Sequence, residues 1–135
     1  VSQNIFLFDG TILENICLGI DESSIDIERV NKVLRKTNLH DFVYSLEDNL
    51  NHSLGENGVN LSGGQSQRLA IARSLYNKPD FLILDEATSA LDKKNEKKIL
   101  STIKELGNKI TIIIISHKDN TTKICDEIIN LQNLN

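Results

Sequence analysis

The sequence lacks the features that mark several classes of protein. It has only two cysteines, Cys17 and Cys125, far apart and without a CxxC or metal-binding spacing, so two reduced thiols are expected in preference to a disulfide. It has no basic excess: the net charge is -4 and the charges are mixed along the chain, which argues against a nucleic-acid partner. No apolar run approaches the ~20 residues of a membrane-spanning helix, and the first residues do not form a signal peptide.

A loop for holding phosphate groups is also missing. The pattern G-x-x-x-x-G-K-[ST] supplies the backbone N–H groups and the lysine that hold nucleotide phosphates in many ATPases. None of the seven glycines begins such a run, and no Gly-Lys pair occurs. The chain nevertheless has the length of one domain, and its 39% hydrophobic and 25% charged residues are typical of a folded globular protein.

Apolar spacing predicts helices in the first half of the chain. A helix is expected over residues 26–38, a short helix around 41–46, a glycine-punctuated loop over 51–62, and a second long helix from Gly63 to Asn77 that Pro79 ends. The apolar stripes of the two long helices are predicted to be Ile27, Val30, Val33 and Leu34 in the first, and Leu69, Ala72, Leu75 and Tyr76 in the second.

The second half has the pattern of an α/β fold. Residues 81–84 and 110–115 are apolar runs of strand length, as expected for strands that are covered on both faces. Helices are predicted over 92–106, with Gly107 as the C-cap, and over 119–124, and a third strand over 128–131. Alternating strands and helices of this kind indicate a parallel sheet.

Two segments place reactive side chains directly after predicted strands. Asp85 and Glu86 follow residues 81–84, and Ser116 and His117 follow the run of isoleucines. Because ligands bind parallel sheets at the carboxyl ends of the strands, these side chains are expected near one edge. There an aspartate can hold Mg²⁺, the next carboxylate can deprotonate a water, and a histidine can donate to a phosphate. Taken alone, an acidic helix N-cap and a surface histidine explain the same residues.

A third segment, "LSGGQ" over residues 61–65, opens the predicted helix 63–77. Ser62 followed by Gly63 and Gly64 offers a hydroxyl and exposed backbone N–H groups at a helix N-terminus, which favours an anion, and the glycines allow the backbone to approach it closely. A serine-capped helix after a flexible loop is the alternative interpretation.

The order and spacing of these segments resemble the nucleotide-binding domain of ATP-binding cassette (ABC) transporters. Residues 1–16 are similar to the family's Q-loop and the segment after it, with Gln3 as the glutamine, and "LSGGQ" is the family signature. "FLILDE", "SALD" and "IISH" resemble the Walker B motif, the D-loop and the switch-histidine loop. The resemblance implies a P-loop NTPase-like α/β fold, with a helical signature subdomain at about residues 10–78 and the second half of the parallel-sheet core at about 79–135.

The resemblance also implies where the missing loop belongs. In this family the P-loop lies upstream of the Q-loop, so the chain is expected to be the C-terminal portion of a cassette that is inactive on its own. In the complete cassette, ATP and Mg²⁺ are the implied ligands. Asp85 and Gln3 would help to place Mg²⁺, Glu86 would polarise the attacking water, and His117 would hold the γ-phosphate.

The implied partners are a second nucleotide-binding domain and a membrane domain. Two cassettes of this family close head to tail, so that the signature residues of one contact the γ-phosphate held by the other; here these are Ser62, Gly63, Gly64 and Gln65. Asp92 would lie across that dimer interface. The expected location is the cytoplasmic face of a membrane, as part of an integral membrane transporter, and no nucleic acid is expected.

Two details are similar to the exporter branch of the family. "SLGENG", residues 53–58, resembles the exporter segment that touches the coupling helices of the membrane domain, and Ala87 stands where importers and translation-factor relatives usually have proline. The expected function is therefore ATP hydrolysis that powers export. A soluble ABC-type ATPase and a non-catalytic module from a truncated cassette are the alternatives.

Overall fold

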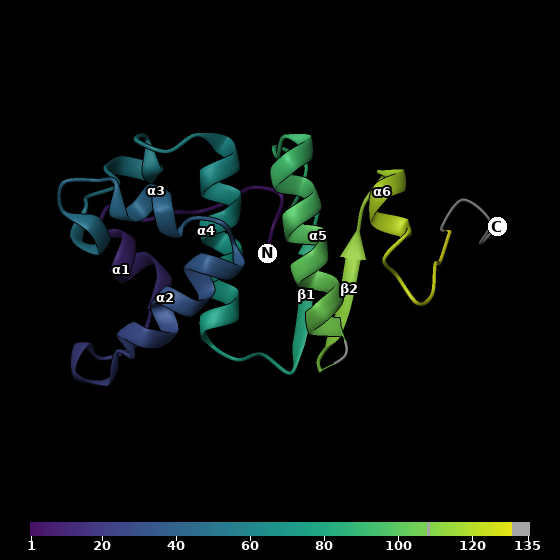
Figure 1. Ribbon diagram of the computed structural model, residues 1–135, viewed down its shortest axis with the longest axis horizontal. Helices are drawn as coiled ribbons and strands as arrows, with labels where there is room; N and C mark the ends of the chain where they lie inside the picture. The colour runs from purple at the N-terminus through teal and green to yellow at the C-terminus, as the bar shows by residue number, and fades with distance from the viewer. Residues whose placement is uncertain (108, 131–135) are drawn as a thin grey trace.

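The computed structural model describes residues 1–107 and 109–130. Four helices, α1 (Ile12–Ile16) to α4 (Gly63–Tyr76), gather at one end of the molecule (Figure 1). Strands β1 (Phe81–Asp85) and β2 (Thr111–Ile115) lie beside them with helix α5 (Lys93–Gly107), and α6 (Asp119–Thr122) follows beyond β2. A helical first half and an α/β second half are confirmed by this arrangement.

The first half consists of α1 (Ile12–Ile16), α2 (Ile27–Lys36), α3 (His40–Tyr44) and α4 (Gly63–Tyr76), with short 3-10 turns at Glu22–Ser24, Asn49–Asn51 and Glu56–Gly58. The helices predicted over 26–38, 41–46 and 63–77 are confirmed within two residues at each end. Of the two predicted stripes only Ile27 is exposed, by 44%, because it is the first residue of α2.

Helix α1 is not predicted by the apolar spacing, because five residues are too few to show a period. Its signal is a capping box: the Thr11 hydroxyl accepts a hydrogen bond from the Glu14 N–H at 3.1 Å, and the Glu14 carboxylate accepts one from the Thr11 N–H at 2.7 Å. The pair S/T-x-x-E at residues 11–14 could have identified this helix in the sequence.

The second half contains β1 (Phe81–Asp85), α5 (Lys93–Gly107), β2 (Thr111–Ile115) and α6 (Asp119–Thr122). The two strands pair in parallel from Phe81 opposite Thr111 to Asp85 opposite Ile115. On the other edge of β1, the backbone of Val1 accepts a hydrogen bond from the Asp85 N–H at 2.9 Å and donates one to the Ile83 carbonyl at 2.6 Å. In the described residues β1 is therefore bonded along both edges.

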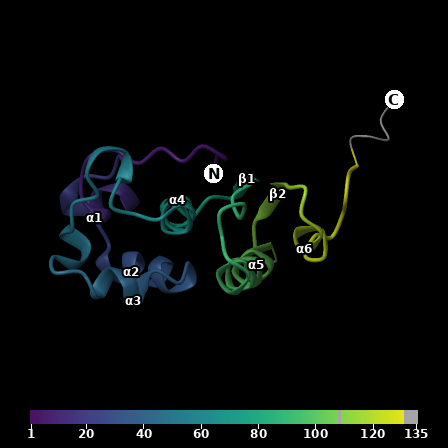
Figure 2. The same cartoon turned by 90° about the horizontal axis from the view of Figure 1, so that it is seen from above.

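Two predictions about the sheet are wrong. Residues 128–130 are not in a strand, and Ile128 and Ile129 are exposed by 62% and 70%; residue 131 lies outside the described residues. Among residues 1–107 and 109–130, only α5 covers the sheet, and it covers one face (Figure 2). Leu82 and Leu84 on that face are buried, whereas Phe81 and Ile83 on the other are about half exposed. An apolar run alone does not show whether both faces of a strand are packed against other elements or only one face is.

The core joins the two halves. Buried apolar side chains of α1, α2, α4, β1 and α5 form one cluster, which includes Ile16, Leu34, Leu69, Leu84 and Ile99. Arg73 of α4 ties this cluster to the beginning of the chain, because its guanidinium donates to the carbonyl oxygens of Asn15 and Phe6 at 2.7 and 2.9 Å.

The two cysteines are free thiols, as predicted, and burial raises the pKa of Cys17. None of the helices in the described residues has the length and apolar character needed to cross a membrane.

Candidate functional site

The carboxyl ends of β1 and β2 meet at one edge of the sheet. Asp85 is the last residue of β1 and lies opposite Ile115, the last residue of β2. The Glu86 N–H continues the ladder by donating to the Ile115 carbonyl at 2.9 Å. His117 follows two residues later, so the acidic pair and the histidine lie at the same edge, as the strand pattern predicts.

Glu86 is the centre of a three-residue network. One carboxylate oxygen accepts a hydrogen bond from Nε2 of Gln3 at 2.8 Å, and the other contacts Nδ1 of His117 at 3.0 Å. Because a carboxylate only accepts, Nδ1 of His117 is the donor of that bond. The side chain of Glu86 is 25% exposed and that of His117 is 72% exposed, so the network opens to solvent on the histidine side.

The backbone of Glu86 is held in an uncommon conformation. Its φ angle is +47°, in the left-handed region that residues other than glycine seldom adopt. Its N–H is bonded to β2, and its carbonyl accepts from the Ser89 N–H at 2.9 Å. Such a conformation is stable only where the surroundings enforce it, and it is concentrated at functional sites. It turns the chain sharply out of β1 and directs the carboxylate toward Gln3 and His117.

Asp85 differs from Glu86 in having a free carboxylate. No hydrogen bond or ion pair of its side chain occurs within residues 1–107 and 109–130, and it is half-buried. The same described residues contain no cluster of three His, Cys, Asp or Glu side chains that could hold a metal alone. Mg²⁺ is usually bound by one or two carboxylates together with substrate phosphates and water, so a single free aspartate at a strand end fits this ion. The Gln3 amide is bonded to Glu86, and no contact joins it to Asp85.

The signature segment begins helix α4 with a capping box. The Ser62 hydroxyl accepts from the Gln65 N–H at 3.3 Å, and Oε1 of Gln65 accepts from the Ser62 N–H at 2.7 Å. These side chains therefore stabilise the helix end within the chain. The N–H groups of Gly63 and Gly64 have no acceptor among the described residues, which leaves two donors of the first turn available to an anion.

The two glycines have a second role that the sequence pattern does not indicate. A Cβ added at Gly64 would lie 3.3 Å from the carbonyl oxygen of Ala90, and one at Gly63 would lie 3.5 Å from the Ala90 side chain. The beginning of α4 thus packs directly on the turn that follows β1. Close approach of two backbone segments of the same chain is itself a reason for a glycine at position 64.

Asp92 caps helix α5. One carboxylate oxygen accepts from the N–H groups of Lys94 and Asn95 at 2.9 and 3.0 Å, and the other accepts from the Asn95 amide at 2.5 Å. These hydrogen bonds hold the pKa of Asp92 below its usual value, and the charge of Arg68 contributes in the same direction. The carboxylate is exposed, and no contact joins it to the network around Glu86.

Gln67 is a residue of the site for which the sequence analysis gives no role. It is buried on α4, and its amide donates to the Ser89 hydroxyl at 2.9 Å and accepts from the Ala90 N–H at 3.0 Å. A longer contact of 3.5 Å reaches the Glu86 carbonyl. Gln67 thereby connects the signature helix to the turn that holds Glu86. A polar residue one turn into an otherwise apolar helix face was the available signal.

Lys118 is a second such residue. Its ammonium group donates to the Thr88 carbonyl and to the buried carboxylate of Glu96, both at 2.9 Å. It follows His117 directly and so fixes the end of β2 against the turn after β1 and against α5.

The chain is similar to known proteins. The family model described as ABC transporter matches residues 1–89. The chain is 42% identical over 132 residues to the ABC multidrug transporter MDR5 of Trichophyton rubrum, with 98% of this chain and 10% of the relative covered. It is 43% identical over 133 residues to an ATP-dependent lipid A-core flippase of Ralstonia nicotianae, with 98% and 22% covered. The chain therefore spans between a tenth and about a fifth of the length of these relatives.

A solved structure agrees in three dimensions. The structure of a bacterial Atm1-family ABC exporter with ATP bound superimposes with a TM-score of 0.82 at 39% sequence identity, and the match covers 88% of this chain and 21% of that one. The likeness includes the helical first half as well as the parallel strands, because so large a share of the chain is covered.

Proposed function

The chain belongs to the ABC transporter family, and we propose that it forms the C-terminal part of the nucleotide-binding domain of an exporter. Residues of about 10–78 are assigned to the helical signature subdomain and about 79–135 to the second half of the ATPase core. Joined to a phosphate-binding loop from outside these residues, the domain binds and hydrolyses ATP at the cytoplasmic face of a membrane. Its closure and reopening drive a membrane domain that exports a substrate.

The observation that carries this proposal is the network of Gln3, Glu86 and His117. A carboxylate fixed by donors on both oxygens and open to solvent on one side can orient a water and accept its proton. His117 donates to Glu86 through Nδ1, so Nε2 is the nitrogen that faces the γ-phosphate, and it donates to a phosphate oxygen when both ring nitrogens carry a proton. Gln3 comes from the other edge of β1 and responds to movements of the first segment of the chain.

Mg²⁺ is the implied metal, and Asp85 is the residue proposed to hold it. Its free, half-buried carboxylate at the end of β1 supports this assignment. Held by Asp85 together with the nucleotide phosphates, the ion would supply positive charge that offsets the negative charge of the phosphates. We propose that Gln3 also contacts the metal ion or a water molecule bound to it.

The signature supports the assignment of a second cassette as partner. Ser62 and Gln65 cap helix α4, and the free N–H groups of Gly63 and Gly64 are suited to the γ-phosphate held by the facing subunit. Asp92 and the turn before it pack on this helix and are proposed to lie across the dimer interface. In such an assembly Gln67 would connect the signature of one site to the Glu86 of the other.

An exposed apolar surface supports contact with the membrane domain. Phe6 and Val59 are 66% and 76% exposed, although both are large apolar residues. Their segments are adjacent, because a Cβ at Gly58 would meet the side chain of Leu7. Single exposed apolar residues are common, but two on touching segments beside residues 53–58 are suited to the coupling helices of an exporter.

The test is the ATPase rate of the complete protein that carries this chain. Glu86→Gln keeps the shape of the side chain and its acceptor oxygen but removes its ability to take a proton. We expect it to abolish phosphate release while ATP binding remains. Glu105→Gln, on an exposed position of α5, is the matched control and is expected to keep the parental rate. Parental hydrolysis by Glu86→Gln would overturn the assignment of the base.

A further inference from the structure

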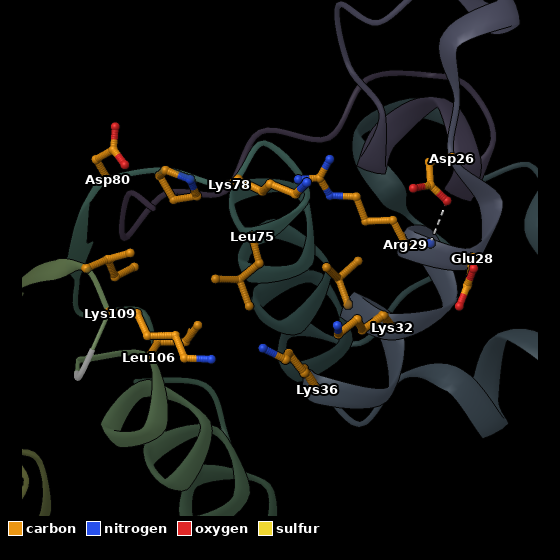
Figure 3. Close-up of a pocket in the computed structure, with 13 residues that line it drawn as sticks. Asp26, Glu28, Arg29, Lys32, Lys36, Leu75, Lys78, Asp80, Leu106 and Lys109 are labelled. Atoms are coloured by element: carbon orange, nitrogen blue, oxygen red, sulfur yellow. Dashed lines mark hydrogen bonds between the residues drawn. The ribbon is translucent and has the colours of Figure 1, made fainter.

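A pocket of about 460 Å³ lies at the end of the sheet opposite to Glu86. Its walls are α2, the end of α4 with the turn into β1, and the end of α5 with the turn into β2 (Figure 3). Asp80 precedes β1 and Ile110 precedes β2, whereas Glu86 and His117 follow these strands. A strand of five residues is roughly 16 Å long, so the pocket is separate from the hydrolytic site.

The pocket is basic in a chain that is acidic overall. Its lining includes five cationic side chains, Arg29, Lys32, Lys36, Lys78 and Lys109, and three acidic ones, Asp26, Glu28 and Asp80, although the net charge of the chain is -4. Within residues 1–107 and 109–130, none of the five cations forms an ion pair. A concave surface with an excess of charges of one sign, here five cations against three carboxylates, concentrates ions of the other sign.

The acidic residues of the lining offset only part of this positive charge and form no ion pair with the five cations in the described residues. The carboxylate of Asp26 is occupied as the N-cap of α2, where it accepts the Arg29 N–H at 2.9 Å. Figure 3 shows Asp26 and Glu28 together at one side of the pocket and Asp80 at the other. The amino groups of Lys36, on α2, and Lys109, in the turn between α5 and β2, point toward each other (Figure 3).

The floor of the pocket is apolar. Val33 and Leu75 are buried, and Leu106 and Ile110 are half-buried beside them. Arg29 is fixed above this floor, because its guanidinium lies 5.1 Å from the centre of the Tyr76 ring. An apolar base with charged groups around it is the usual composition of a small-molecule site, and the volume is in the usual range of ~300–1,000 Å³.

We propose that this basic pocket binds a small phosphorylated organic anion. Its phosphate groups contact the lysines of α2 and Lys109 of the turn before β2, and its carbon skeleton lies on Leu75, Leu106 and Ile110. Two or more phosphate groups match the cations, because these come from three separate elements around the pocket. The site is distinct from the one proposed for ATP hydrolysis and uses none of its residues.

The first test uses inorganic tripolyphosphate as the probe, titrated into the full 135-residue chain by calorimetry at low salt. The double variant Lys36→Gln with Lys109→Gln removes the two facing charges. Lys93→Gln with Lys97→Gln removes two exposed charges from α5 away from the pocket and is the matched control. We expect about tenfold weaker binding in the first variant, less than about twofold in the control, and a steep loss of affinity with added salt for the parent.

A second probe tests the apolar floor. 1-Naphthyl phosphate has the same phosphate group as inorganic phosphate plus an aromatic ring, so it is expected to bind more tightly to the parent and to lose this advantage in Leu106→Ser. Far-ultraviolet circular dichroism of each variant checks the fold. Equal tripolyphosphate affinity in the lysine variant and its control would overturn the proposal, and so would equal affinity for the two monophosphates.

Discussion

Replacement of Gln67 by leucine is expected to weaken both the fold and the site. Leucine has nearly the same volume and suits a side chain that is only 3% exposed, so no cavity is created. The loss is that of two hydrogen bonds of ordinary length, to Ser89 at 2.9 Å and from Ala90 at 3.0 Å. The 3.5 Å contact with the Glu86 carbonyl adds little.

The magnitude follows from the neutral character of these bonds. Each contributes a net ~0.5–1.5 kcal/mol to the free energy of unfolding, so the two together contribute about 1–3 kcal/mol. Ser89 and Ala90 are exposed and can bond to water after the change, which places the expected loss in the lower half of this range. With a urea dependence of ~2 kcal/mol per M, the middle of the usual range, the unfolding midpoint should fall by about 0.5–1 M.

The assay is urea unfolding of the parent, Gln67→Leu and Ser74→Ala. Ser74 is the control on the same helix, because its hydroxyl bonds only the Ala70 carbonyl one turn earlier. The control should stay within about 0.5 kcal/mol of the parent. In the complete protein, Gln67→Leu should also lower the ATPase rate, since the turn that holds Glu86 at positive φ is released. An unfolding midpoint equal to that of the control would refute the reasoning.

Three further predictions concern the signature segment, the stability of the fold at acidic pH and the activity of the isolated chain. Gly64→Asp in the complete protein should abolish ATP hydrolysis while ATP binding survives. A mixture of this variant with a subunit that lacks a working P-loop should recover one active site. Gly63→Ala should lower the rate of hydrolysis less, because the added Cβ would make an ordinary contact with Ala90. Hydrogen bonds from Thr11 lower the pKa of Glu14. Their contribution to the free energy of unfolding is therefore present above the usual glutamate pKa and is lost as the pH falls through the lowered value. The difference in urea midpoint between the parent and Glu14→Gln should accordingly become smaller in acid. The 135-residue chain alone should release no phosphate from ATP in a phosphate-release assay, and any turnover that Glu86→Gln removes would contradict this.

Local signals in the sequence were sufficient for most of the fold. Helices α2 and α4 have apolar stripes, and β1 and β2 are isoleucine- and leucine-rich runs of strand length, so each could be predicted from its own residues. The failures depend on more distant parts of the protein. Whether Phe81 and Ile83 are buried depends on which element packs on their face of the sheet. Whether residues 128–130 form a strand depends on a neighbouring strand with which they can pair. The spacing of apolar residues in these segments gives neither piece of information.

The site shows the same division. The strand ends predicted that Glu86 and His117 would lie at one edge, and the structure brings them within hydrogen-bond distance. The link from Gln3 crosses 83 positions of the chain, and only the resemblance to a family suggested a role for that residue. Gln67, Lys118 and the contact of Gly64 with Ala90 were not predicted, because tertiary packing decides which polar side chain meets which turn.

We propose that Glu86 accepts the proton of the attacking water in ATP hydrolysis. A single-turnover measurement on the complete protein tests it most directly, because labelled ATP bound at one equivalent per site reports the conversion to ADP independently of product release. We predict that the parent converts the bound ATP and that Glu86→Gln retains it intact in a closed dimer visible by size-exclusion chromatography. Conversion of the bound ATP by Glu86→Gln at the parental rate would contradict the account.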